Sequence, residues 1–274
     1  MSITLVGPAG IPSIGFGTFR MQGAATVDIV AAALAEGYTH IDTAQVYENE
    51  EEVGAGIARS SVPRDRIFLT TKIFPDHFAP DAFKAATEES LRKLGTDYVD
   101  LMLLHWPSRT VPIEDTIGAL NDVIAAGKVR HGGISNFTIA MTDTARAALN
   151  TPLAANQVEM HPFIDQSKLL GHLASIGVPF EAYSPLALGK VMDDPVLKDI
   201  AAAHGVSAVQ VSLAWILTKP GAVVLPKTST ASRLRGNLAA AELKLSVEDI
   251  GRIDVLASPE GRITSPESLA PDWD

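Results

Sequence analysis

Short runs of β-branched and apolar residues alternate along the chain with longer, alanine-rich segments whose apolar positions recur at helical spacing. The short runs predict eight strands, at Ser13–Phe16, Thr39–Asp42, Ile67–Lys72, Val99–His105, His131–Ser135, Ala155–Glu159, Pro179–Ser184 and Val223–Pro226. The longer segments predict helices between and after them, at Thr26–Gly37, Glu50–Ser60, Pro80–Leu94, Ile113–Gly127, Thr138–Leu149, Ser167–Ile176, Val196–Ala203, Val209–Leu217 and Ala231–Ala240. Most of these helices end at glycine or begin beside Ser, Thr, Asp or Pro, which favour helix ends.

Several predicted strands are apolar at nearly every position, as in IFLTTK, VDLMLLH and AVVLPK. Such strands are typical of parallel sheets that are covered on both faces. About eight strand–helix units in strict alternation predict a single (β/α)8 TIM barrel, with a doubly wound sheet as the alternative. No linker-like stretch divides the chain, so we expect residues 1–274 to form one domain. Ile3–Leu5 and the turn at Gly7–Gly10 predict a short N-terminal β-hairpin, and the turn-rich sequence after Leu256 predicts a short irregular C-terminal tail.

The composition argues against several classes of function. The 274 residues include 22 Lys+Arg and 32 Asp+Glu, a formal net charge of −10, which argues against binding to nucleic acid or to anionic lipid. The absence of cysteine excludes disulfides, thiolate zinc sites, iron–sulfur clusters and cysteine nucleophiles, and we expect no metal site. The chain shows neither a signal-peptide pattern nor about eighteen consecutive apolar residues, so we expect a cytoplasmic protein without a membrane span.

Polar side chains gather at the predicted carboxyl ends of the strands, where barrel enzymes place their functional groups. Asp42, Lys72 and His105 each end a strand, and Tyr47 follows Asp42 by five residues. We expect the Lys72 ammonium to lower the pKa of the Tyr47 phenol and Asp42 to keep Lys72 charged. His105 could polarise a substrate carbonyl by donating a hydrogen bond. Each residue alone is as readily a turn cap, a surface charge or a half-buried side chain, but together they indicate proton transfer.

The segment around Asp42 and Tyr47 resembles the signature of the aldo-keto reductase family. It reads GYTHIDTAQVYENE from Gly37 to Glu50, an Asp-Thr-Ala stretch followed by the tyrosine and an Asn-Glu pair. Further stretches agree in family order: FLTTK at Phe68–Lys72, DYVDL to HWP within Asp97–Pro107, GISNF at Gly133–Phe137, NQVE at Asn156–Glu159, YSPL at Tyr183–Leu186 and LPKT at Leu225–Thr228. The resemblance covers nearly the whole chain and is closest to small bacterial members of the 2,5-diketo-gluconate reductase type.

The resemblance implies an NADPH-dependent reductase of small aldehydes and ketones. The implied catalytic tetrad is Asp42, Tyr47, Lys72 and His105, with Tyr47 as the general acid in hydride-transfer reduction. The implied substrates are 2-oxoaldehydes, keto-sugar acids and aromatic aldehydes. The implied cofactor-binding residues are Gly17, Thr18, Asp42, Ser135, Asn136, Gln157, Tyr183, Ser184, Leu186, Lys227, Thr228, Arg233 and Asn237.

The stretch after the last predicted strand has the chemistry of an anion site. Lys227, Thr228 and Arg233 place two cations and a hydroxyl at the start of the last predicted helix, which suits the 2′-phosphate of NADPH. The alternative is that Arg233 lies on the surface of that helix. Gly236 departs from the family pattern, which usually has an acidic or amide residue before Asn237. No GxGxxG fingerprint follows a strand, so a Rossmann site is not supported.

Aromatic residues are expected to line the substrate pocket. Phe19, Phe74 and Trp106 would join Tyr47 and His105 there, although Phe74 is equally compatible with the core. The short tail predicts an open pocket mouth and broad specificity. The resemblance favours a monomer whose partner is a small carbonyl compound. Two alternatives are a non-catalytic NADPH-binding sensor and a phosphate-handling isomerase or aldolase barrel.

Overall fold

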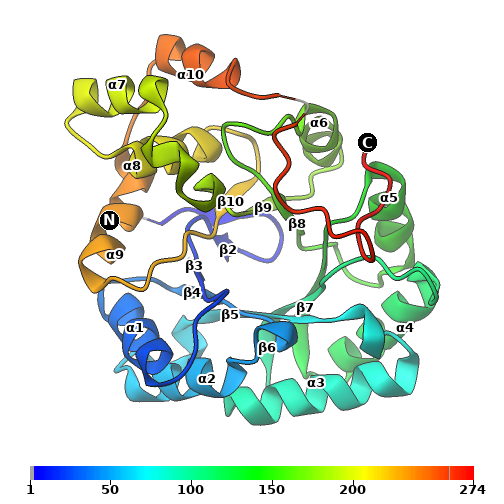
Figure 1. The fold of residues 1–274 in the computed structure, drawn as a ribbon. Helices are drawn as coiled ribbons and strands as arrows, with labels where there is room; N and C mark the ends of the chain where they lie inside the picture. Colours follow the sequence, from blue (N-terminus) through cyan, green and yellow to red (C-terminus); the bar gives the residue numbers. More distant parts are fainter. Residues whose placement is uncertain (1–2, 259) are drawn as a thin grey trace.

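Eight parallel strands form the central sheet of the computed structural model, which describes residues 3–258 and 260–274 (Figure 1). Neighbouring strands pair in chain order, and Ile14 forms a parallel bridge to Val224 that joins the first segment to the last strand. This closure confirms the predicted (β/α)8 barrel and excludes the doubly wound sheet. The strands are β3 (Phe16–Gly17), β4 (His40–Asp42), β5 (Phe68–Ile73), β6 (Val99–Leu104), β7 (Val129–Ser135), β8 (Asn156–Glu159), β9 (Phe180–Tyr183) and β10 (Ala222–Val224).

Helices surround the strands on the outside of the barrel (Figure 1). They are α1 (Ala24–Ala35), α2 (Glu50–Arg59), α3 (Pro80–Leu94), α4 (Ile113–Ala125), α5 (Ile139–Ala148), α6 (Ser167–Ser175), α7 (Pro195–His204), α8 (Ala208–Leu217), α9 (Leu234–Ala239) and α10 (Val247–Asp254). The sequence analysis missed α10. Its local signal is a capping box, in which the Ser246 and Asp249 side chains each accept the other residue's backbone N–H. Within the described part of the chain, no single helix is long and apolar enough to span a membrane. Helices α7 and α8, which are bent by 91° relative to each other, together have the length and composition of a span.

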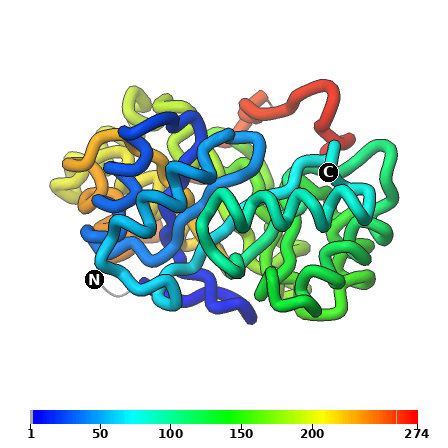
Figure 2. Tube along the Cα trace, turned by 90° about the horizontal axis from the view of Figure 1, so that it is seen from below, coloured from blue at the N-terminus to red at the C-terminus, as the bar shows by residue number. Residues whose placement is uncertain are grey.

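The predicted N-terminal hairpin is confirmed as β1 (Leu5–Val6) and β2 (Ile11–Pro12), which pair antiparallel. Gly7 and Gly10 in its turn both have positive φ, and a side chain at Gly7 would overlap the Pro179 ring at the start of β9. The hairpin therefore packs against the amino ends of the strands. Figure 2 shows it at the end of the barrel opposite the C-terminal tail.

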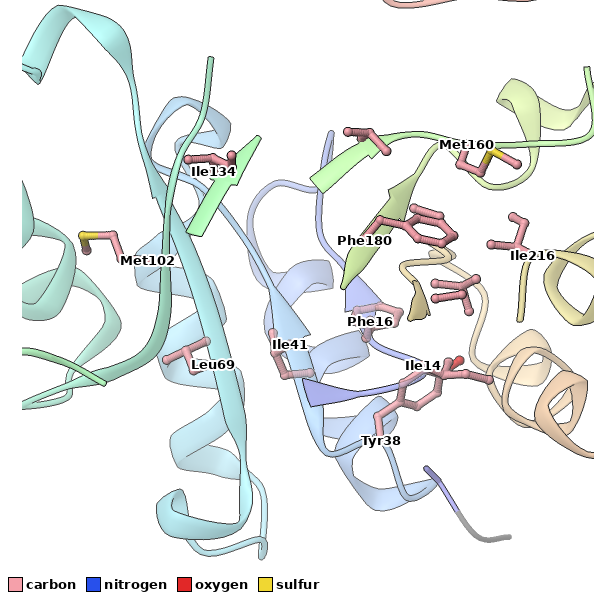
Figure 3. Packing of buried hydrophobic residues seen from close by; sticks show 14 of the residues in the cluster. Ile14, Phe16, Tyr38, Ile41, Leu69, Met102, Ile134, Met160, Phe180 and Ile216 are labelled. Atoms are coloured by element: carbon pink, nitrogen blue, oxygen red, sulfur yellow. The ribbon is translucent and has the colours of Figure 1, made fainter. Parts of the chain in front are cut away.

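Side chains alternate along the strands between two apolar regions. On β6, Met102 and Leu104 point outward into the main core between strands and helices, whereas Leu101 and Leu103 point into the barrel. Figure 3 shows other members of the main core, including Phe16, Tyr38 and Phe180. Inside the barrel, the hairpin residue Ile11 packs with Leu101, Leu103, Ala154, Ala155, Val223 and Leu225. This apolar plug leaves polar side chains to occupy the other end of the interior.

Helices α2 and α3 approach so closely that only glycine fits between them. A Cβ on Gly54 would lie 2.5 Å from the Leu94 carbonyl oxygen, which is rigid backbone. We therefore expect Gly54→Ala to lower the free energy of unfolding by about 1–3 kcal/mol, as overpacking does. The control is Gly118→Ala on the exposed face of α4, where a Cβ meets no atom within 4 Å. That variant should gain about 0.5–1 kcal/mol from helix propensity. Thermal unfolding of the three proteins measures both, and equal stabilities would contradict the close approach.

Candidate active site

The carboxyl ends of the strands surround a cavity of about 800 Å³. All residues predicted from the sequence to form the site line this cavity, except two. Thr18 and Lys72 are fully buried behind its wall. The structure therefore brings together residues from every strand of the barrel, because the carboxyl ends of parallel strands meet at one end of it.

Lys72 forms the centre of a hydrogen-bonded group at the bottom of the cavity. Its Nζ donates to Asp42 Oδ1 at 2.7 Å, to the Thr43 carbonyl oxygen at 2.8 Å and to the Tyr47 hydroxyl at 3.4 Å. Lys72 is fully buried, and Asp42 is only 3% exposed. A buried ammonium is stable only when its charge and its hydrogens are both compensated, and these three acceptors provide that.

The ionisation of this group differs in one respect from the prediction. Burial opposes the charge on Lys72, but Asp42 and Tyr47 outweigh it and raise the pKa of Lys72, so the ammonium persists. Burial also raises the pKa of Tyr47, and Lys72 only partly offsets this effect. The prediction that Lys72 leaves the Tyr47 pKa lowered is therefore wrong for the net shift, although the ammonium does act in that direction. The phenol remains protonated at neutral pH, as a proton donor must.

His105 follows β6 and lies beside Tyr47 at the cavity wall. The two rings meet edge to face with centroids 5.7 Å apart, and Phe74 packs edge-on against the other side of His105 at 6.0 Å. Burial, together with the charge of Lys72, holds the pKa of His105 well below its ordinary value. The imidazole is thus neutral, with one N–H to donate and one nitrogen to accept.

Four polar residues from β7, β8 and β9 form one wall of the cavity. The Tyr183 hydroxyl donates to Asn136 Oδ1 at 2.8 Å, and Asn136 Nδ2 donates to the His105 carbonyl oxygen and to Ser135 Oγ, each at 3.1 Å. Ser135 Oγ in turn donates to the Gln157 carbonyl oxygen at 2.9 Å. Asn136 has φ 64°, a left-handed conformation that asparagine tolerates better than most residues. These hydrogen bonds among the wall residues hold their side chains in place without a ligand.

The Asn-Glu pair after Tyr47 anchors the loops beneath the cavity. Asn49 Nδ2 donates to the carbonyl oxygens of Thr18 at 2.9 Å and Met21 at 3.0 Å. The Thr18 hydroxyl donates to the Asp42 carbonyl oxygen at 2.9 Å, so Thr18 joins the β3 and β4 ends instead of facing the cavity. Glu50 is buried on α2, where its carboxylate accepts from the Thr71 hydroxyl at 2.6 Å.

The far end of the cavity is basic. Lys227, Thr228, Arg233 and Asn237 line it, and neither Lys227 nor Arg233 has an acidic partner among residues 3–258 and 260–274. Gly236 also lines this end, and a Cβ there would meet no atom within 4 Å. Two unpaired cations beside a hydroxyl and open space form an electrostatically favourable site for an anion.

The short C-terminal tail contributes to the cavity wall, which the sequence analysis did not predict. The tail is irregular as expected, but it crosses the cavity end of the barrel and finishes beside α5, where Asp274 accepts the Ile139 N–H at 2.8 Å (Figure 1). Thr264 and Pro266 line the cavity, and Trp273 packs edge to face against Trp106 at 6.3 Å. No local pattern in the sequence predicts these contacts, because all of them join the tail to distant parts of the chain.

A buried carboxylate on β8 holds the tail in place. Glu159 accepts the backbone N–H of Ile263 at 2.6 Å, that of Thr264 at 2.7 Å and a ring nitrogen of His161 at 2.9 Å. Burial opposes the charge, but these hydrogen bonds hold the pKa of Glu159 below its ordinary value. Arg262 stacks over the Trp273 ring at 3.7 Å, which extends the anchored segment towards the end of the chain.

We expect Glu159→Gln to loosen the tail, because an amide cannot accept both backbone N–H groups through its two ends. The lost bond should cost about 1–3 kcal/mol, and trypsin should cleave after Arg262 several times faster. Mass spectrometry of the released 263–274 peptide measures the rate. Glu267→Gln is the matched control, since that side chain is exposed in the same segment. Equal cleavage of the two variants would contradict the anchoring role of Glu159.

Several cavity residues were missed by sequence reasoning. Apolar side chains of Val46, Leu188 and Met192 line the cavity rim and are 46–67% exposed. They lie in the 3-10 segments Gln45–Tyr47 and Ala187–Met192, which are too short to show a periodic pattern. Glu181 is fully buried on β9 beside Gln157. Strand alternation could have identified it, because residues two apart on a strand share a face and Tyr183 was already assigned to the site.

Comparisons with known proteins cover nearly the whole chain. A model of the aldo/keto reductase family matches residues 13–258. The chain is 41% identical over 267 residues to methylglyoxal reductase DkgB of Escherichia coli O157:H7, covering 96% of this chain and 99% of that protein. It is 37% identical over 260 residues to glyoxal reductase of Bacillus subtilis (strain 168), covering 94% of each. Among solved structures, one assigned as a 2,5-diketo-D-gluconic acid reductase B has a TM-score of 0.97 and 47% identity, covering 100% of this chain and 98% of that one.

Proposed function

Because the chain belongs to the aldo/keto reductase family, we propose that it reduces small aldehydes and ketones with NADPH, using Tyr47 as the general acid. Membership makes it an oxidoreductase that acts on carbonyl and alcohol groups with a nicotinamide cofactor. The observation that supports the finer assignment is the buried chain from Asp42 through Lys72 to the Tyr47 hydroxyl. Through this chain, the Lys72 ammonium polarises the O–H of Tyr47, which lines the cavity.

The proton that completes reduction comes from Tyr47. As negative charge develops on a carbonyl oxygen, the phenol donates its proton to that oxygen and the Lys72 ammonium stabilises the phenolate left behind. Asp42 holds the ammonium in position through the 2.7 Å ion pair. The raised pKa of Tyr47 keeps the phenol protonated at neutral pH, ready to donate its proton.

His105 orients the substrate instead of competing for its proton. A neutral imidazole can donate a hydrogen bond to the carbonyl oxygen, whereas an imidazolium would place a second charge beside Lys72. The low pKa of His105 keeps it neutral through the physiological range. Its edge-to-face contacts with Tyr47 and Phe74 hold the ring at the wall where that oxygen must lie.

The residues present suit a nicotinamide dinucleotide phosphate. Gln157 lines the cavity, and its Oε1 accepts no hydrogen bond from the described residues, so it is free for a carboxamide N–H. Ser135, Asn136 and Tyr183 would hold the same end of the cofactor, which supplies the hydride when bound. At the other end, Lys227 and Arg233 supply the charge that a 2′-phosphate needs.

The cavity walls favour small carbonyl compounds. Phe19, Phe74 and Trp106 line the substrate end, and the tail residues Thr264 and Pro266 also line the cavity. Two relatives are named for methylglyoxal and glyoxal, and we propose 2-oxoaldehydes as the first substrate class, followed by keto-sugar acids and aromatic aldehydes. Exclusion of water by these walls would protect the charge developing on the carbonyl oxygen.

Turnover tests the proposal directly. The wild-type protein should consume NADPH, followed by its absorbance, when methylglyoxal is added. Tyr47→Phe should lower kcat by about 10²- to 10⁴-fold, because the acid is removed while the ring remains. NADPH binding, measured by protein fluorescence, should stay within about twofold as the control. An unchanged kcat would show that Tyr47 is not the acid, and tight binding without any wild-type turnover would favour the sensor alternative.

Cofactor choice depends on the basic end of the cavity. Lys227→Ala and Arg233→Ala should each weaken NADPH binding by about 10- to 100-fold, since each removes a charge-assisted contact. NADH binding should change little, because NADH lacks the 2′-phosphate. Lys244→Ala, outside the cavity lining, is the control. Equal weakening of both cofactors would contradict the phosphate assignment.

A further inference from the structure

Glu181 is a buried carboxyl next to the catalytic group, and the mechanism above does not use it. It pairs in register with Gln157 across β8 and β9, so both side chains point into the barrel. Glu181 Oε2 accepts from Gln157 Nε2 at 3.1 Å, and the side chain is fully buried. Its other oxygen, Oε1, has no hydrogen-bond partner among the described residues.

Both hydrogens of the Gln157 amide nitrogen are therefore committed. One goes to Asp42 Oδ2 at 2.9 Å and the other to Glu181. Because the amide is planar, two N–H bonds in different directions fix the plane of the group as well as its nitrogen. The position of Oε1 follows, and a flipped amide would turn that oxygen towards two carboxyl groups. A single bond to Asp42 would leave the amide free to rotate about it.

The charges around Glu181 allow it to accept this bond at neutral pH. Asp42 and His40 face it from β4, with His40 Nε2 3.8 Å from Glu181 Oε1, and Lys72 faces it from β5. Burial, with the charge of Asp42, raises the pKa of Glu181 to about 8, so the carboxyl carries a proton near neutrality. A proton on Oε1 leaves Oε2 as the acceptor. Burial also lowers the pKa of His40 to about 4, so His40 brings no charge.

We propose that Glu181 is a positioning residue that fixes the amide of Gln157 so that its oxygen always faces the nicotinamide carboxamide. This inference rests on the proposed function, because Gln157 meets a carboxamide only when a nicotinamide fills the cavity. Glu181 itself touches neither substrate nor cofactor, since it does not line the cavity. Glu181 preorganises the Gln157 amide, so that cofactor binding does not carry the entropy cost of ordering a rotating side chain.

The test compares two cofactors that differ only at the carboxamide. Reduced 3-acetylpyridine adenine dinucleotide phosphate has a methyl group in place of the amide NH₂, so it cannot donate to Gln157. The wild-type protein should prefer NADPH over this analogue, as measured by Kd from protein fluorescence. Glu181→Leu removes the acceptor at similar volume, and the preference should shrink about five- to tenfold, the equivalent of one hydrogen bond. Glu181→Gln keeps an acceptor oxygen and should retain the preference.

Glu50→Leu is the matched control, because Glu50 is an equally buried carboxyl that bonds Thr71 and lies outside the cavity lining. It should leave the preference unchanged. An unchanged preference in Glu181→Leu, or the same loss in Glu50→Leu, would overturn the inference and leave the proposed function intact. A wild-type protein that binds neither cofactor would overturn both.

A second measurement uses the free protein. In ¹⁵N NMR spectra, the two side-chain N–H protons of Gln157 should exchange slowly with solvent in the wild type and in Glu50→Leu, because both are hydrogen-bonded. Glu181→Leu should speed this exchange at least several-fold, and equal rates would overturn the inference. If the leucine variant does not fold, Glu181→Met, which is flexible and unbranched, takes its place in both measurements.

Discussion

The buried ammonium of Lys72 is the constraint on which the polar end of the barrel depends. An uncompensated charge in the interior costs several kcal/mol, and Lys72 has no exposed surface to water. Its three bonds all reach one short stretch of chain, from Asp42 through Thr43 to Tyr47. The position of one side chain on β5 therefore determines how the chain leaves β4 and where the phenol lies.

The division of the barrel interior follows from the same constraint. Polar groups buried among parallel strands must bond one another, and here they form a continuous group from Lys72 through Asp42 and Gln157 to Glu181. The apolar plug that includes Ile11 fills the opposite end and needs no partners. Of this group, Asp42 and Gln157 line the cavity, whereas Lys72 and Glu181 are fully buried behind it.

Strand-end reasoning predicted the polar strand-end residues of the cavity, the family resemblance implied further lining residues, and the failures have physical causes. Asp42 and Gln157 were found because alternation and the carboxyl-end rule are local and geometric. The tail contacts could not be found, since Glu159 binds Thr264 across more than a hundred residues. The net pKa shift of Tyr47 depends on burial, which only the packed structure determines. Helix α10 was missed because its capping box is a short signal within a polar sequence.

Closure of the barrel also has consequences for synthesis of the chain. Ser13 and Gly15 form their hydrogen bonds with Val224, about two hundred residues later. Until β10 leaves the ribosome, the first segment has an unpaired edge, a surface on which nascent chains associate wrongly. The tail reaches Glu159 later still. The cavity is thus completed by residues that follow the whole barrel in the sequence, and a chain that lacked residues 263–274 would present an unfinished pocket on an otherwise closed barrel.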